Sequence, residues 1–153
     1  QVMLQKIGGR IMGLDDPAKK MSKSALSEYN YISLLDAPNQ VEKKIMKAVT
    51  DSGPDIRFDE KKKPAVSNLL TIFSLLSGES IKNLESRYAG KGYGVFKKDL
   101  VIAVNDFLQP FQKRFQEFSE SSKLEKILQQ GKKKAEQVAE KTLDQVKTVL
   151  GLG

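Results

Sequence analysis

Two lysines, Lys20 and Lys23, carry the clearest chemical signal in the sequence. They stand in the run Lys-Met-Ser-Lys-Ser at residues 20–24, within a basic, serine-containing loop. Two ammonium groups on such a loop can close over a triphosphate, because a unit charge pair at ~4 Å contributes ~4 kcal/mol at an effective dielectric of about 20. The serine hydroxyls and the loop amides add neutral donors. The residue types therefore indicate a loop that binds phosphate.

Two side chains that dominate enzyme active sites are absent from the sequence. It contains no cysteine and no histidine. These absences exclude Ser-His-Asp and Cys-His catalysis, thiolate zinc sites and imidazole acid–base groups within this chain. Any reaction that involves the chain must use charge, positioning and hydrogen bonding.

The charge balance of the chain is strongly basic. Twenty-six Lys and Arg residues against nineteen Asp and Glu leave a net charge of +7 over 153 residues. Such a surplus favours polyanions, namely nucleic acid, nucleotide phosphates or an acidic membrane surface. A well-solvated basic surface without a partner is an equally good explanation of composition alone.

The chain shows no sign of membrane insertion or export. No apolar run approaches the roughly 20 residues that a membrane-spanning helix needs, and residues 1–6 lack the apolar core of a signal peptide. We therefore expect no membrane partner. The lack of cysteine suits a cytoplasmic protein.

The elements that must hold the lysine loop are short. Residues 6–14 form an apolar stretch bounded by glycines, which predicts a buried strand. Asp15-Asp16-Pro17 then turns the chain into the loop, and residues 29–35 are a weaker strand candidate. A lone strand and loop cannot form a core. We therefore expect residues 1–35 to be the end of a larger domain that the chain only partly contains.

From residue 36 onwards the pattern is helical. Apolar residues recur at helical spacing, Pro38 and Pro64 suit helix starts, and Gly78 suits a helix end. Phe107, Phe111, Phe115 and Phe118 share one helical face; we favour bundle core for them over a base-stacking platform. The sequence predicts a C-terminal bundle of about five helices over residues 36–153, and a mainly α chain.

The lysine loop and its flanks resemble a known family. The run at residues 20–24 is the KMSKS signature of class I aminoacyl-tRNA synthetases, and Gly9-Arg10-Ile11-Met12 looks like the family strand that lies against adenine. Further blocks are similar to the bacterial tryptophanyl-tRNA synthetases in order and spacing. These blocks are residues 48–52, 63–70, 76–81 and 88–100, so the resemblance covers about residues 8–151.

The resemblance implies roles for individual residues. In the family the signature loop binds ATP during formation of the aminoacyl adenylate. The resemblance implies that Lys20 and Lys23 are catalytic and contact the triphosphate. It also implies that the ATP-binding residues are Ile11, Lys20, Met21, Ser22, Lys23 and Ser24. Mg²⁺ travels with the nucleotide in this family, so no protein metal ligand is expected.

The resemblance also implies what this chain lacks. Class I enzymes need an upstream signature that contains histidine, and this sequence has no histidine. The tryptophan pocket and most of the Rossmann-type nucleotide-binding sheet would lie in that missing half, together with most of the dimer interface. The predicted fold is therefore the last strand and KMSKS loop of a truncated Rossmann-type domain, followed by the helical bundle. The chain alone is expected to be inactive.

A C-terminal helical domain that meets the tRNA anticodon region is a further implication of the resemblance. The candidate RNA-binding residues are all basic: Lys97, Lys98, Arg114, Lys132, Lys133 and Lys134. Three alternatives stay open at this point. The chain could be a non-catalytic RNA-binding helical module, part of a tyrosyl-type class I synthetase, or a basic bundle that binds a protein or an acidic membrane.

Two further motifs have structural explanations. Gly90-Lys91-Gly92 suggests a phosphate loop, but a Walker motif needs Ser or Thr after the lysine, so we predict a tight turn between helices. Asp15 and Asp16 precede Pro17 and are expected to form a turn or cap rather than a metal site.

Overall fold

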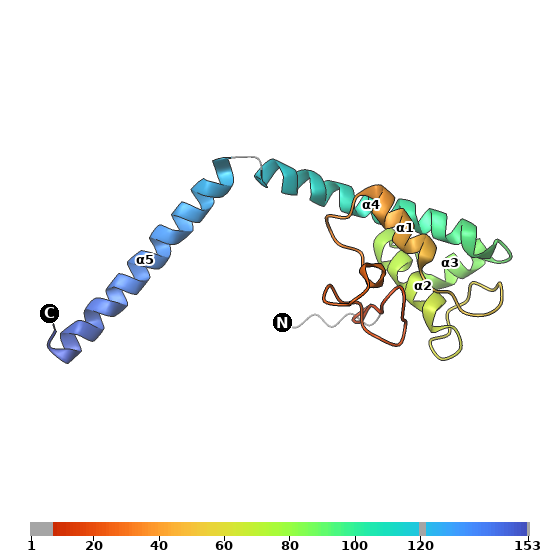
Figure 1. Cartoon of the computed structure of the whole chain (residues 1–153), viewed down its shortest axis with the longest axis horizontal. Helices are drawn as coiled ribbons and strands as arrows, with labels where there is room; N and C mark the ends of the chain where they lie inside the picture. The colour runs from red at the N-terminus through yellow and green to blue at the C-terminus, as the bar shows by residue number, and fades with distance from the viewer. Residues whose placement is uncertain (1–7, 120–121, 153) are drawn as a thin grey trace. The chain divides into compact units, whose positions relative to one another are not determined.

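The computed structural model describes residues 8–119 and 122–152, and these residues are mainly helical (Figure 1). The chain divides into two units, and the boundary between Gln112 and Lys113 falls within a helix. A short 3-10 turn, η1, spans Glu28–Asn30. The helices are α1 (Pro38–Lys47), α2 (Pro64–Ser77), α3 (Ile81–Tyr88), α4 (Gly92–Ser119) and α5 (Ser122–Leu150).

The helices of the first unit begin and end at residues that suit those positions. Proline stands in the first turn of α1 and of α2, where its missing N–H costs nothing. The Asp51 carboxylate accepts hydrogen bonds from the N–H groups of Ala65 and Val66 at the start of α2, at 3.4 and 2.9 Å. Gly78 ends α2 with a φ of 72°, a left-handed conformation that favours glycine. The expected helix boundaries at Pro38, Pro64 and Gly78 are thus confirmed.

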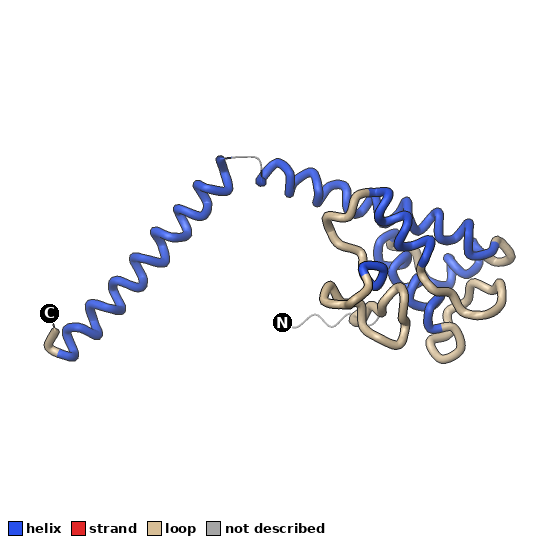
Figure 2. Tube along the Cα trace, viewed as in Figure 1, coloured by secondary structure: helices blue, strands red, loops and turns tan. Residues whose placement is uncertain are grey.

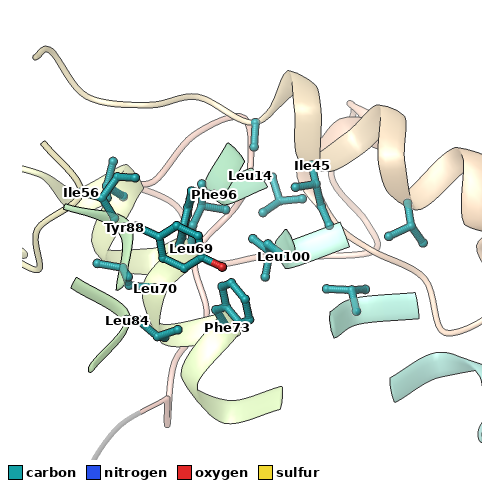
Figure 3. Close-up of a cluster of buried hydrophobic side chains, with 14 of the residues drawn as sticks. Leu14, Ile45, Ile56, Leu69, Leu70, Phe73, Leu84, Tyr88, Phe96 and Leu100 are labelled. Atoms are coloured by element: carbon teal, nitrogen blue, oxygen red, sulfur yellow. The ribbon is translucent and has the colours of Figure 1, made fainter. Parts of the chain in front are cut away.

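The core of the first unit is built around three rings. Phe73 of α2, Tyr88 of α3 and Phe96 of α4 have centroids 5.2 to 5.9 Å apart, and Figure 3 shows these side chains pointing toward one another. Aliphatic side chains fill the space around them, including Val41, Ile45, Leu69, Leu70, Leu84 and Leu100, all at most 1% exposed. The apolar faces of α1, α2, α3 and the first part of α4 are therefore buried in one cluster.

The turn between α3 and α4 is the tight interhelical turn that the sequence predicts. Gly90 and Gly92 have φ values of 74° and 73°, and α4 begins at Gly92 itself. Since helices lie on both sides of the turn, it lacks the strand that precedes a phosphate loop.

The predicted strands are wrong for the part of the chain that the structure describes. Residues 6 and 7 lie outside the described residues, and residues 8–14 form a bend and a single antiparallel bridge between Met12 and Lys20. The second candidate, residues 29–35, contains part of η1 instead. Figure 2 accordingly shows only helices and loops in the described residues. Extended backbone needs partners for its N–H and C=O groups, and side chains supply several of them here.

The four phenylalanines predicted for the bundle core lie outside the core of the first unit. Phe107, Phe111, Phe115 and Phe118 are 42–56% exposed, whereas the core cluster ends at Leu108. Helix α4 has 28 residues and α2 has 14, so α4 is roughly 40 Å long against roughly 20 Å, and only its first part reaches the core. Helix α5 buries no residue. Its apolar residues include Leu124, Ile127, Leu128, Val138, Val146, Val149 and Leu150, which are 43–86% exposed.

Candidate functional site

The signature residues form an exposed turn in the first unit. Lys20, Ser22, Lys23 and Ser24 are all exposed. Ser22 shapes the turn twice, because its carbonyl accepts from the Ala25 N–H at 3.1 Å and its hydroxyl accepts from the Ser24 N–H at 3.2 Å. Lys20 and Lys23 have no ion pair among the described residues. Both ammonium groups are therefore available to a phosphate.

The neighbouring Lys19 differs from the two signature lysines. Its Nζ lies 3.0 Å from an Asp16 carboxylate oxygen, and 81% of the lysine side chain is exposed. The hydrogen bond from Lys19 and one from the Ala18 N–H lower the pKa of Asp16 from its ordinary value. The Asp15-Asp16-Pro17 segment thus forms a turn, as expected.

Backbone hydrogen bonds attach the start of the turn to residues 11–13. The Met21 N–H donates to the Ile11 carbonyl at 3.0 Å, and the Gly13 N–H donates to the Lys19 carbonyl at 2.8 Å. Met12 and Lys20 form the antiparallel bridge between these two bonds. The segment that carries Ile11 is therefore paired directly with the segment that carries the first signature lysine.

Two buried asparagines hold this paired segment. Asn30 is 5% exposed, and its side chain binds both the Ser22 N–H and the Asp15 carboxylate. Asn68 on α2 is 7% exposed and binds both the N–H and the carbonyl of Met12. Buried polar groups at these positions keep all their hydrogen bonds inside the protein.

Ile11 and Met21 line the same apolar cavity, which has a volume of about 320 Å³. The two side chains come from the two paired segments, so the pairing places them on a common side. The rest of the lining is also apolar: Ile32, Leu34, Ile72, Leu75, Leu76, Val104, Phe107 and Leu108. An apolar cavity beside an exposed pair of lysines can accept a flat ring while phosphates lie on the loop.

Arg10 and Met12 line a second, smaller cavity of about 220 Å³ against α2. Its lining includes the polar side chains of Glu60, Ser67, Asn68 and Thr71. Residues 10–12 therefore alternate, with Ile11 at the apolar cavity and its two neighbours at the second cavity. No group of three or more Asp, Glu, Cys or His side chains that could bind a metal occurs in the residues the structure describes.

Among the candidate RNA-binding residues, Lys97 must be removed. It is 7% exposed, and its Nζ donates to the carbonyls of Met46 and Ala48 at the end of α1, at 3.1 and 2.6 Å. Burial lowers the pKa of Lys97 from its ordinary value. A phosphate cannot reach this ammonium group, because the group is covered and hydrogen-bonded to a helix terminus.

The remaining candidate RNA-binding residues are exposed. Lys98 lies on α4 in the first unit, and Arg114 lies on α4 in the second unit. Lys132, Lys133 and Lys134 follow one another on α5, where Lys132 forms an exposed pair with Glu136 at 3.7 Å. Exposed pairs of this kind contribute little to stability, so these side chains can turn to a phosphate.

Sequence reasoning missed Asn30 and Asn68. A signal for Asn68 existed, since it interrupts the apolar run of α2 at a position that helical spacing buries. A buried asparagine inside an apolar helix face must have polar partners. Asn30 gave no comparable signal, because it lies in a short polar stretch whose burial depends on the surrounding loops.

Comparisons with known proteins match the chain along its length. The family model described as tRNA synthetases class I (W and Y) matches residues 1–109. The tryptophan–tRNA ligases of Bacillus subtilis (strain 168) and Oceanobacillus iheyensis are 50% and 49% identical to it over all 153 residues. These 153 residues correspond to 46% and 47% of the two relatives, so the chain spans about half of their length.

Solved structures give the same result. The chain is similar to tryptophanyl-tRNA synthetase from Mycoplasma pneumoniae, with a TM-score of 0.73 and 36% identity over 97% of this chain and 45% of that one. The enzyme from Campylobacter jejuni gives a TM-score of 0.75 and 31% identity over 94% of this chain and 44% of that one.

No described helix is both long and apolar enough to cross a membrane.

Proposed function

The chain belongs to the class I tRNA synthetases of the tryptophanyl and tyrosyl type. We propose that it is the part of a tryptophan–tRNA ligase that carries the ATP-binding signature loop and a tRNA-binding surface. The relatives that match along the whole chain are tryptophan–tRNA ligases, which favours this enzyme over a tyrosyl one. The observation that carries the proposal is the exposed turn with Lys20 and Lys23, anchored to the protein at Ser22.

In the proposed reaction, a tryptophan carboxylate oxygen attacks the α-phosphorus of ATP. The bond from this phosphorus to the bridging oxygen breaks, and pyrophosphate leaves with the negative charge that develops. Lys20 and Lys23 lie on the triphosphate and bind it more strongly as this charge grows, so they lower the barrier. The tryptophanyl group of the adenylate is then transferred to tRNA(Trp), and AMP leaves. Tryptophan itself would bind in the part of the complete enzyme that this chain does not contain.

Roles for the other signature residues follow from the same proposal. Ile11 and Met21 line the apolar cavity beside the loop, and Ile11 would lie against the adenine ring. The Ser24 N–H donates to the Ser22 hydroxyl, and this bond shapes the turn. Mg²⁺ would arrive on the nucleotide; the described residues bring no carboxylate cluster together, so we assign no metal ligand to the chain.

Replacing Lys23 tests the proposal. In the complete enzyme, Lys23→Ala should lower tryptophan-dependent ATP–pyrophosphate exchange about 100-fold, by analogy with the loss of one preorganised transition-state donor. Lys43→Ala is the matched control, because Lys43 is an exposed lysine on α1 in the same unit. Exchange that is unchanged in the Lys23 variant, or reduced equally in both, would remove Lys23 from the mechanism.

The tRNA-facing role rests on the exposed basic residues Lys98, Arg114, Lys132, Lys133 and Lys134. A salt titration of the chain with tRNA(Trp) and an unrelated tRNA separates two outcomes. A preference for tRNA(Trp) that persists at moderate salt would support recognition by this part of the enzyme. Equal binding that disappears with salt would show only phosphate attraction by the +7 charge.

As the family implies, we further propose that the complete enzyme is a cytoplasmic homodimer.

A further inference from the structure

Asn30 makes a set of hydrogen bonds that spans the base of the signature turn. Its side-chain oxygen accepts from the Ser22 N–H at 2.9 Å, and its side-chain Nδ2 donates to the Asp15 carboxylate at 2.6 Å. Its backbone carbonyl accepts from the Leu14 N–H at 3.0 Å. A residue that is 5% exposed thus connects the turn that precedes the loop with the loop itself.

The two side-chain bonds require a side chain that both accepts and donates. The Ser22 N–H can only donate and the Asp15 Oδ1 accepts, so the side chain between them must offer one acceptor and one donor. The Asn30 amide has room only because residue 13 is glycine. A Cβ on Gly13 would lie 2.2 Å from Asn30 Nδ2 and 3.0 Å from the Asp16 carbonyl oxygen. Gly13 and Asn30 are therefore matched to each other.

We propose that Asn30 is a positioning residue for the phosphate-binding loop. By holding the backbone of Ser22, it limits the positions from which Lys20 and Lys23 reach the triphosphate. Because the loop is then partly ordered before ATP arrives, less conformational entropy is lost when the lysines engage the phosphates. The effect on catalysis rests on the proposed function of the loop. The ordering of the Ser22 backbone by Asn30 does not depend on that function.

An Asn30→Asp variant tests the structural part, because it makes the anchor depend on pH. As a carboxylate, residue 30 would face the Asp15 carboxylate with no proton between them, and the two would repel each other. As a neutral acid, it can donate to Asp15 and still accept from Ser22. Two carboxyl groups this close share a proton, which raises the pKa of one of them. Charged groups in the adjoining segments include the Asp16–Lys19 pair and Lys47, which lies over the Tyr29 ring, together with Lys20, Lys23 and Glu28.

The expected result is a reversible loss of protection at one amide. Relative to the unsubstituted chain, hydrogen-exchange protection of the Ser22 N–H in Asn30→Asp should fall about tenfold at pH 8 and recover at pH 5. Protection in the unsubstituted chain should not differ between these pH values. Wild-type protection of Ser22 in Asn30→Asp at pH 8 would overturn the proposal.

A swapped pair provides the matched control. In the double variant Asp15→Asn with Asn30→Asp, the amide of residue 15 donates to the carboxylate of residue 30, so this bond is restored with its direction reversed. The carboxylate of residue 30 still accepts from the Ser22 N–H, so that bond keeps its original direction. Ser22 protection should return at pH 8. If Asn30→Asp fails to fold at pH 8, as shown by circular dichroism, the double variant decides: recovery supports the anchor, and no recovery overturns it.

The catalytic part is measured in the complete enzyme at pH 8. Asn30→Asp should lower kcat for ATP–pyrophosphate exchange about tenfold and leave KM for tryptophan unchanged, and the swapped pair should restore kcat. Normal kcat in a variant with lost Ser22 protection would overturn the positioning role. Failure of the proposed function has a different result, in which Lys23→Ala leaves exchange unchanged while the amide measurements still respond to residue 30.

Discussion

The side-chain amide of Asn68 pairs with the backbone of Met12 in the way that a neighbouring β-strand would. The Met12 N–H donates to Oδ1 at 2.9 Å, and Nδ2 donates to the Met12 carbonyl at 2.8 Å. One side chain on α2 therefore satisfies both polar groups of a residue 56 positions away. Because Met12 is bridged to Lys20, this pairing connects α2 to the signature loop.

Asn68→Ala should destabilise the first unit by about 1–3 kcal/mol, because it removes both partners of Met12. Asn83→Ala is the control, since Asn83 is exposed on α3 and a surface change usually stays within about 0.5 kcal/mol. Urea unfolding measures both free energies. Equal values for the two variants would show that the Asn68 pairing adds nothing to stability.

Gly13→Ala should cost about 1–3 kcal/mol, because the new Cβ would overlap the Asn30 amide and press on the Asp16 carbonyl. Gly94→Ala should have the opposite effect and stabilise by up to about 1 kcal/mol. Gly94 lies in the first turn of α4 with nothing within 4 Å of an added Cβ. Thermal unfolding of the two variants measures this contrast, and a shift of the same sign in both would contradict it.

Lys97→Met and Lys98→Met should affect different properties of the protein. Lys97→Met removes the ammonium group that binds the last carbonyls of α1, so we expect a loss of about 1–3 kcal/mol and unchanged affinity for tRNA. Lys98→Met should leave stability within about 0.5 kcal/mol and weaken tRNA binding in a salt-dependent way. Unfolding and tRNA titrations measure both. Stability that is insensitive to Lys97→Met would contradict the structural role.

The buried hydroxyl of Tyr88 should make the free energy of unfolding decrease in alkaline solution. Burial, together with a hydrogen bond from its hydroxyl to Asp99 at 2.7 Å, raises the pKa of Tyr88 above its ordinary 10.0. Its contribution is therefore complete below pH 10 and decreases above it, since only the unfolded chain ionises there. Between pH 9 and 11 the unsubstituted chain should lose about 1 kcal/mol more than Tyr88→Phe. Parallel unfolding curves for the two proteins would contradict this assignment.

Part of the candidate site could be recognised from residue types and spacing alone. The run at residues 20–24 identified the loop, and the structure leaves Lys20 and Lys23 exposed on it. The catalytic roles of Lys20 and Lys23 stay predictions, and so do the ATP-binding roles of Ile11, Lys20, Met21, Ser22, Lys23 and Ser24. The residues that hold the loop, Asn30 and Asn68, could not be recognised, because their partners come from other parts of the chain.

The sequence by itself determined the helices of the first unit and the charge of the signature loop. Helical spacing, Pro38 and Pro64 at helix starts, Gly78 at a helix end and the charge of the lysines are local properties, and they act within a few residues. Only the tertiary structure decided burial. The Lys97 ammonium group meets a carbonyl 49 residues away, and Phe111, Phe115 and Phe118 of α4 follow Leu108, the last residue of the core cluster. Contacts at such separation depend on how whole helices pack, which no short run of residues specifies.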